Sequence, residues 1–253
     1  MTPNSGSRIL PASPWRLAAP SFIWPARVGE NCRRLQGLVD EAALVFFQTQ
    51  GCLEYDQEDL PPWMVNLDLS YHLHLPLDLP WEQGGEATAD AAVALADKVA
   101  FCRPWGYVLH PPRETRTFLS FHRRWCYHGL SSSSLILENI EDNDLTSIMP
   151  AVVETECRIC LDFGHLIAYG QWKLLDEVSL HNRLCMLHVY APVGGHSHKS
   201  LTELSVRDHH TLMSLLAVLP TTGVVVLEVF SWPDLQSSLD IFSLWIRNWD
   251  STS

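Results

Sequence analysis

Short β-type runs alternate with helix-like segments along this chain, and this alternation restricts the possible folds more than any other feature. The expected strands cover residues 21–24, 43–47, 70–75, 106–109, 134–137, 158–161, 184–187 and 223–227. The expected helices cover residues 29–38, 88–101, 114–127, 145–156, 172–178, 206–219 and 235–249. Strands that alternate with helices form a parallel sheet with right-handed crossovers. Eight such units in 253 residues predict an α/β fold, a single closed (β/α)8 TIM barrel.

The main rival fold is an open, doubly wound sheet, which usually carries a glycine-rich phosphate loop after its first strand. The sequence has no such loop and no linker that would divide the barrel. We therefore expect one domain over residues 20–250, preceded by a flexible lead-in over residues 1–19. Pro11, Pro14 and Arg16 interrupt that lead-in, so it does not resemble an export signal. With no apolar run of roughly 18 residues either, we expect a cytoplasmic protein without a membrane partner.

Charge and cysteine content narrow the class of protein further. The net charge is −12 and no basic stripe is present, so we expect no nucleic-acid partner. The seven cysteines are odd in number and scattered, which is typical of reduced thiols in the cytosol. Cys157 and Cys160 form a C-x-x-C within a predicted strand. We interpret them as buried thiols rather than as a redox or zinc pair.

Residues able to bind metals occur at the ends of the last six predicted strands. They are His72 and His74, His110, Glu138, Asp162 with His165, His188, and Glu228. The carboxyl ends of barrel strands converge on one mouth, so these side chains are expected to meet there. Carboxylates and imidazoles packed together are stabilised by cations between them. The mixed nitrogen and oxygen set favours Zn²⁺, Mn²⁺ or Fe²⁺ over Ca²⁺.

The local spacing of these residues refines the ligand set. His72 and His74 share one face of their strand, and His74 lies nearer its carboxyl end, which makes it the better ligand. His72 is expected beneath the site or packed inside the barrel. After the seventh strand, His196-Ser197-His198 follows Gly194 and Gly195. This H-x-H segment either closes the site from above or is a solvated loop.

Other aromatic and imidazole side chains are assigned by position alone. Trp24, Trp81 and Trp105 lie near predicted strand or loop ends, where they would form an apolar rim for a large flat ligand or a dimer contact. The sequence does not fix the oligomeric state. The remaining histidines are predicted to lie at the surface: His122, His128, His181, His209 and His210.

The order of these motifs resembles that of the xylose-isomerase-like barrel superfamily, in particular the branch of endonuclease IV-type AP endonucleases. In that branch the equivalent residues hold up to three divalent metals that cleave a phosphodiester. The resemblance implies the ligands His74, His110, Glu138, Asp162, His165, His188, His198 and Glu228. The family loop usually reads Asp-x-His, whereas here His196 stands in place of the Asp. The resemblance therefore implies two or three metal ions per chain.

Several longer stretches resemble the cobamide-remodelling phosphodiesterases. They are SFIWPARVGENCRRL, LSYHLHLPLDLPW, YVLHPP, CLDFGHLIAYGQ and LEVFSWPDLQSSL. This resemblance implies an enzyme, a metal-dependent hydrolase that opens the nucleotide loop of a cobamide and releases a cobinamide-type product for corrinoid salvage. Glu138 and Glu228 are then the expected catalytic residues, which bridge or position metals and hold the attacking water.

Three alternatives stay open at this point. A sugar or keto-acid isomerase or epimerase on the same barrel needs one metal, which Glu138, Asp162, His188 and Glu228 would satisfy. It does not need the four additional histidines, and the predicted mouth has no obvious lysine to act as acid or base. DNA repair is disfavoured by the acidic charge. A carrier without enzymatic activity is disfavoured by the cost of keeping buried carboxylates.

Overall fold

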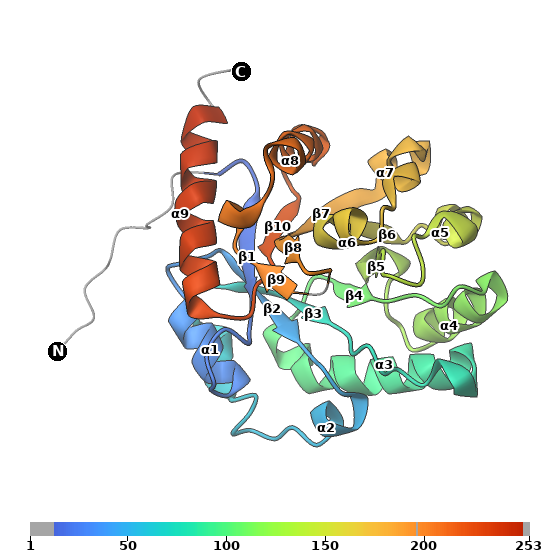
Figure 1. Ribbon diagram of the computed structural model, residues 1–253. Helices are drawn as coiled ribbons and strands as arrows, with labels where there is room; N and C mark the ends of the chain where they lie inside the picture. Colours follow the sequence, from blue (N-terminus) through green and yellow to red (C-terminus); the bar gives the residue numbers. More distant parts are fainter. Residues whose placement is uncertain (1–12, 196, 250–253) are drawn as a thin grey trace.

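Eight parallel strands close into a barrel in the computed structural model, which describes residues 13–195 and 197–249 (Figure 1). Around the barrel the strands follow the order β1-β10-β7-β6-β5-β4-β3-β2. Their bounds are β1 (Arg16–Pro20), β2 (Glu41–Val45), β3 (Ser70–His74), β4 (Tyr107–Leu109), β5 (Leu135–Glu138), β6 (Arg158–Asp162), β7 (Leu184–Val189) and β10 (Val224–Leu227). The predicted (β/α)8 fold is confirmed.

Helices surround the barrel on the outside (Figure 1). They are α1 (Val28–Leu35), α2 (Thr49–Leu53), α3 (Gly85–Val99), α4 (Thr115–Tyr127), α5 (Met149–Thr155), α6 (Phe163–Ala168), α7 (Val178–Arg183), α8 (Val206–Val218) and α9 (Trp232–Trp249). The sequence missed the short helices α2, α6 and α7, since five or six residues are too few to show helical periodicity. Within the described ranges, no helix has the length and apolarity needed to cross a bilayer.

The first strand was predicted wrongly. It spans Arg16–Pro20 rather than residues 21–24, so at least residues 16–19 of the expected lead-in belong to the barrel. Ala18 pairs with both Val226 of β10 and Glu41 of β2, which closes the ring of strands. Alanine has weak β propensity, so the sequence pattern predicted the strand in residues 21–24, which contain Phe22 and Trp24, instead of in residues 16–20. Residues 1–12 lie outside the described part of the chain.

Side-chain alternation along the strands divides the core into two layers. Small and β-branched residues such as Ala18, Val108 and Val226 fill the barrel interior, together with Cys160. Larger residues such as Trp125, and also Cys157, pack between the strands and the helices. Both cysteines of the C-x-x-C are thus fully buried, Cys160 inside the barrel and Cys157, directly before β6, against the helices, in agreement with their interpretation as structural thiols.

A polar cluster closes the amino-terminal end of the barrel. Glu41, at the start of β2, lies 2.6 Å from the His72 ring and 2.7 Å from the Arg16 guanidinium. The indole of Trp105 donates a 2.8 Å hydrogen bond to the same carboxylate. His72 is therefore packed inside the barrel beneath the mouth, one of the two predicted positions. Trp105 lies at the opposite end from the mouth, so its assignment to the rim was wrong.

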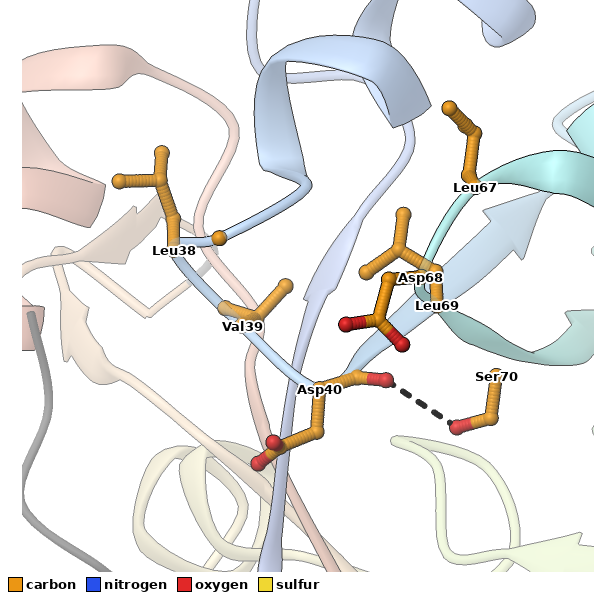
Figure 2. A pocket seen from close by; sticks show the side chains of 8 residues that line it. Leu38, Val39, Asp40, Leu67, Asp68, Leu69 and Ser70 are labelled. Atoms are coloured by element: carbon orange, nitrogen blue, oxygen red, sulfur yellow. Dashed lines mark hydrogen bonds between the residues drawn. The ribbon is translucent and has the colours of Figure 1, made fainter. Parts of the chain in front are cut away.

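The same end of the barrel carries a cavity of about 490 Å³, lined by residues 37–40 and 67–70 (Figure 2). These residues precede β2 and β3, and Ser70 donates a hydrogen bond to the Asp40 carbonyl across the cavity. None of the predicted ligands lines it. Because catalytic side chains of such barrels lie at the carboxyl ends of the strands, size alone does not make this cavity the site.

Candidate metal centre

All eight predicted ligands lie at the carboxyl end of the barrel, each positioned by the end of a strand or the segment after it. Six of them are buried: His74, His110, Glu138, Asp162, His188 and Glu228. The other two lie in other elements. His165 belongs to α6 and its side chain is 16% exposed, and His198 belongs to an additional short strand and its side chain is 21% exposed. The sequence-based expectation that these residues meet at one mouth agrees with their placement.

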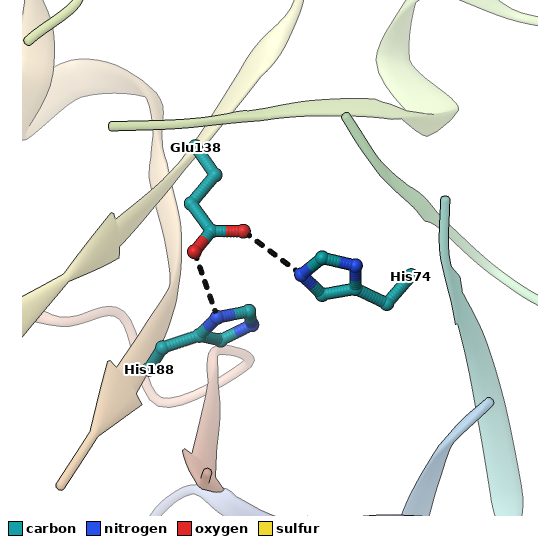
Figure 3. A group of neighbouring side chains, drawn as sticks. All are labelled: His74, Glu138 and His188. Atoms are coloured by element: carbon teal, nitrogen blue, oxygen red, sulfur yellow. Dashed lines mark hydrogen bonds and ion pairs between the residues drawn. The ribbon is translucent and has the colours of Figure 1, made fainter. Parts of the chain in front are cut away.

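Glu138 lies at the centre of this cluster, between two overlapping sets of ligands, since His74 Nε2 also lies 3.9 Å from Glu228 Oε1. One of its oxygens, Oε2, lies 3.1 Å from His74 Nε2 and 3.0 Å from His110 Nε2. The other, Oε1, lies 3.3 Å from His188 Nδ1. Figure 3 shows the His74 and His188 rings approaching the carboxylate from its two oxygens. If two cations were bound, this carboxylate could hold one with each of its oxygens.

The set on the Oε1 side also contains Asp162 and Glu228. His188 Nδ1 lies 3.4 Å from Glu228 Oε1 and 3.9 Å from Asp162 Oδ2. One donor atom from each of these three residues and from Glu138 lies within 4.8 Å of the others. His74, Glu138 and His188 form a second, overlapping group that meets the same criterion. Both groups offer only nitrogen and oxygen donors, which suit Zn²⁺, Mn²⁺ and Fe²⁺.

The buried polar atoms of the centre fit a bound cation. Asp162 Oδ2 and both ring nitrogens of His188 make no hydrogen bond to any described residue. Burying such atoms without a hydrogen bond is costly, even though Asp162 Oδ2 and His188 Nδ1 lie at ion-pair distance from other groups of the centre. His74 Nδ1 contacts the Leu75 carbonyl at 3.1 Å, which assigns the proton of a neutral ring to Nδ1. The Nε2 lone pair of that ring would then face Glu138, an arrangement that a cation between the two would stabilise.

Electrostatics at the centre lead to the same conclusion. Burial, with the charges of Glu228 and Glu138, raises the pKa of Asp162 well above its usual value. Burial also acts to raise the pKa of Glu138 and of Glu228, but the neighbouring histidines together outweigh it, His188 with His110 at Glu138 and His188 with His198 at Glu228. The pKa of Glu138 falls well below its usual value, and that of Glu228 falls to about 2. Three carboxylates thus compete for little positive charge, and a divalent cation among them would allow all three to ionise.

His165 and His198 have ring orientations set by backbone carbonyls. His165 Nδ1 contacts the Asn139 carbonyl at 2.9 Å, and His198 Nδ1 contacts the Glu228 carbonyl at 2.9 Å. Each contact assigns the proton to Nδ1 and leaves Nε2 as the unprotonated nitrogen, the form in which histidine binds metals. Both rings line a cavity of about 180 Å³ together with His74, His110, Glu138 and Glu228.

The segment that carries His198 is a β-hairpin rather than an unstructured loop. Its strands, β8 (Ala191–Val193) and β9 (Ser197–Lys199), pair in antiparallel fashion and place His198 opposite Pro192. Gly194 and Gly195 have φ values of 66° and 90°, which only glycine adopts easily. A Gly-Gly pair between short extended runs is the signal that would have indicated this hairpin. His196 lies outside the described residues, so the effect of the missing Asp stays a prediction.

Asn139 contacts two candidate ligands and was not predicted from the sequence. It is fully buried, and its side chain accepts a hydrogen bond from the Asp162 backbone at 2.7 Å and donates one to the Asp162 carbonyl at 3.1 Å. Its own carbonyl orients His165. The feature of the sequence that could have indicated Asn139 is its position as a polar residue directly after Glu138 at the end of a predicted strand. Asn139 therefore holds two candidate ligands in position from beneath.

Apart from the candidate ligands, the cavity at the mouth is lined by phenylalanine and aliphatic residues and by no tryptophan, so the predicted tryptophan rim was wrong. Trp24 stacks on Trp232 and Trp81 packs on Phe121, outside the cavity. The apolar residues that line the cavity are Val45, Phe46, Phe47, Leu75, Leu77 and Phe230. Among the histidines assigned to the surface, His122 and His209 are half-buried.

Gly164 lies against the Tyr190 ring, which stacks on His198, so a substitution at Gly164 tests the geometry of the centre. A Cβ atom at this position would lie 2.1 Å from the Tyr190 ring, which stacks on the His198 ring at 3.7 Å. We expect Gly164→Ala to lower the free energy of unfolding by about 1–3 kcal/mol and to weaken metal binding by displacing His198. Urea unfolding and metal titration would measure both effects. Gly51→Ala is the matched control, since its Cβ meets no atom closer than 3.8 Å; an equal loss in both variants would contradict the expectation.

Comparisons with known proteins identify the fold. No family model and no curated protein matches the sequence. A D-tagatose 3-epimerase-like protein superimposes with a TM-score of 0.72 at 14% identity, covering 94% of this chain and 99% of the other. Endonuclease IV from Thermus thermophilus has a TM-score of 0.69 at 16% identity, covering 92% and 99%. The 3-keto-D-glucoside 4-epimerase from E. coli has a TM-score of 0.61 at 14% identity, covering 92% and 99%. The chain thus has the barrel fold that these sugar epimerases and endonuclease IV also have.

Proposed function

We propose that this protein is a metal-dependent phosphodiesterase that hydrolyses the nucleotide loop of cobamides and releases a cobinamide-type product. The observation that carries the proposal is the position of Glu138 between two sets of ligands, with His74 and His110 on one oxygen and His188 on the other. Phosphodiester hydrolysis benefits from two cations that stabilise the attacking and the leaving oxygen. The choice of cobamide rests on the sequence resemblance, and we propose zinc, manganese or iron as the metal.

The residues of the centre have distinct roles in this proposal. When bound, divalent cations activate water and neutralise charge on the phosphoryl oxygens. Glu138 joins the two sets of ligands. Glu228 lines the cavity and stays ionised because of its low pKa, so its carboxylate orients the attacking water by accepting a hydrogen bond. The apolar lining of the cavity excludes bulk water and thereby strengthens these electrostatic interactions.

The test is anaerobic incubation of the metal-reconstituted protein with adenosylcobalamin, followed by chromatography of the corrinoids. We expect a cobinamide-type product that forms only with metal and only when Glu228 is intact. Unchanged adenosylcobalamin, with full metal occupancy shown by elemental analysis, would overturn the proposal.

A sugar isomerase or epimerase is the second candidate, and one observation favours it. Glu138, Asp162, His188 and Glu228 alone form a compact four-ligand group, which is sufficient for one metal. The residues that line the cavity disfavour a sugar isomerase or epimerase. Apart from the candidate ligands, every lining residue is apolar, so sugar hydroxyl groups would find few hydrogen-bond partners there.

The variant His110→Asn separates the two candidates. His110 contacts only the Oε2 side of Glu138 and lies outside the four-ligand group. If the centre hydrolyses phosphodiesters, we expect the variant to lose one cation per chain and on the order of 10²-fold in hydrolytic rate. Elemental analysis and the product assay measure these effects, with the exposed His128→Asn as control. Full cation content and full rate in His110→Asn would favour the one-metal interpretation.

Nucleic acid is not part of the proposed function, although endonuclease IV shares the fold. The chain carries a net charge of −12, and the part of the mouth formed by the segments after β4 and β5 includes Glu141, Asp142 and Asp144. Such a surface repels a phosphate backbone. The proposed substrate instead presents a single phosphodiester on a large, mostly uncharged molecule.

A further inference from the structure

Three phenylalanines, two of them exposed and Phe230 partly buried, form a row at one side of the mouth. Phe22, Phe47 and Phe230 follow β1, β2 and β10, which are neighbours in the barrel. The ring centroids of Phe22 and Phe47 lie 4.8 Å apart, and those of Phe47 and Phe230 lie 5.9 Å apart. Phe22 is 39% exposed and Phe47 is 41% exposed. We call these three residues the phenylalanine ledge.

The ledge is continuous with the candidate metal centre. Phe47 and Phe230 line the same cavity as Glu138 and Glu228. At the inner end of the ledge, the Phe230 ring lies 5.1 Å from the ring of the candidate ligand His198. Exposed aromatic side chains gathered at a concave polar site are typical of ligand-binding surfaces. A group that rests on the ledge would therefore be part of a molecule that reaches the metal centre.

The size of the cavity restricts which part of a nucleotide it can enclose. Its volume of about 180 Å³ is below the roughly 300 Å³ or more that is common for pockets enclosing drug-sized ligands. It has room for a phosphate and part of a ribose, so the attached base must lie outside, over the rim. The rim opposite the ledge is polar and includes Arg113, Glu141 and Asp144. Tyr169 also lies on that side, but the ledge offers three adjacent rings beside the cavity, so it is the larger surface for a flat apolar base.

We propose that the phenylalanine ledge stacks the aromatic lower-ligand base of the cobamide nucleotide loop while the phosphodiester lies at the metal centre. This inference rests on the proposed function and deepens it. The phosphodiester must reach Glu138, which is only 1% exposed, at the floor of a narrow cavity. The nucleotide loop therefore extends away from the corrin ring, and the base no longer coordinates cobalt. The bound cobamide is in its base-off form.

Equilibrium binding to the Glu228→Gln protein tests the ledge without turnover. The probes are adenosylcobalamin, which carries the base, and adenosylcobinamide, which lacks it. We expect the absorbance spectrum of cobalamin to change from base-on to base-off upon binding. Adding Phe47→Ala should weaken cobalamin binding about tenfold, as expected for the loss of one base–aromatic stack, and should change cobinamide binding less than about twofold.

The matched control is Tyr127→Ala on α4, which removes a side chain that is 78% exposed and far from the ledge in sequence and fold. Equal weakening of both probes by Phe47→Ala would overturn the inference, because the ledge would then hold the corrin ring. A base-on spectrum in the complex, or no binding of cobalamin, would overturn it as well. A different result would contradict the proposed function but not the ledge. In that case the metal-loaded wild-type protein binds cobalamin in its base-off form, Phe47→Ala weakens this binding, and the cobalamin is not hydrolysed.

Discussion

The variant Glu228→Gln is expected to lower the rate of phosphodiester hydrolysis on the order of 10³-fold while the barrel stays folded. Glu228 Oε1 lies 3.4 Å from His188 Nδ1, and the pKa of Glu228 is lowered to about 2, so the native side chain is a carboxylate at any pH of interest. Glutamine has the same shape but lacks the negative charge that binds a cation and orients water. Chromatographic quantification of the corrinoid product gives the rate.

Folding must be checked beside this rate, because Glu228 is buried. Circular dichroism and thermal unfolding without metal should show the same cooperative transition in the variant and in the wild-type protein. Glu154→Gln on α5 is the matched control, since it removes an exposed carboxylate outside the barrel. A Glu228→Gln protein that is folded and hydrolyses cobalamin at the wild-type rate would remove Glu228 from the catalytic residues.

The second large effect is expected for Glu138→Gln. Its two carboxylate oxygens face His110 and His74 on one side and His188 on the other, so both sets of ligands depend on it. An amide offers only one oxygen and no charge. We expect the variant to lose two cations per chain and all measurable hydrolysis, whereas His110→Asn loses one cation. Elemental analysis after removal of free metal measures the difference.

The outcome for Glu138→Gln also distinguishes a bridging carboxylate from a simple ligand. If the variant loses a single cation and keeps the other at wild-type affinity, Glu138 belongs to one set only. The two-cation interpretation of the geometry would then be wrong. Glu154→Gln again controls for the removal of one carboxylate from the chain.

The barrel was predictable because its signal is repeated. Strands such as Ser70–His74 and Val224–Leu227 consist of β-branched, aromatic or alternating apolar residues, and their order is fixed by the right-handed crossover rule. The first strand was missed because its sequence, Arg-Leu-Ala-Ala-Pro, has weak intrinsic β preference. Its conformation depends on pairing with β2 and β10, which a local sequence pattern does not contain.

The site residues were predictable for a related reason. In a closed barrel the carboxyl ends of all strands meet, so position in sequence translated directly into proximity for His74, Glu138 and His188. The distances and hydrogen bonds between these side chains could not be predicted from the sequence. The position of Glu138 between His74 and His188 and the hydrogen bonds of Asn139 to Asp162 are properties of three-dimensional packing.

The residues that line the mouth could not be predicted from the amino-acid composition. The sequence contains ten tryptophans, and those nearest the predicted strand ends were expected to line the mouth. Trp105 instead donates a hydrogen bond to Glu41 at the other end of the barrel, and Trp24 stacks on Trp232. Large indole rings find their partners in packing layers, whereas the mouth is lined by phenylalanines such as Phe47 and Phe230.

The number of divalent cations bound per chain tests the central claim most directly. The wild-type protein is stripped with a chelator, titrated with Zn²⁺, Mn²⁺ or Fe²⁺, and its metal content is determined by elemental analysis and calorimetry. Two or three tightly bound cations per chain, with at least two lost in Glu138→Gln, are the result that we predict. A single cation per chain, retained in His110→Asn, would contradict the multi-cation centre and leave the one-metal isomerase as the better account of this barrel.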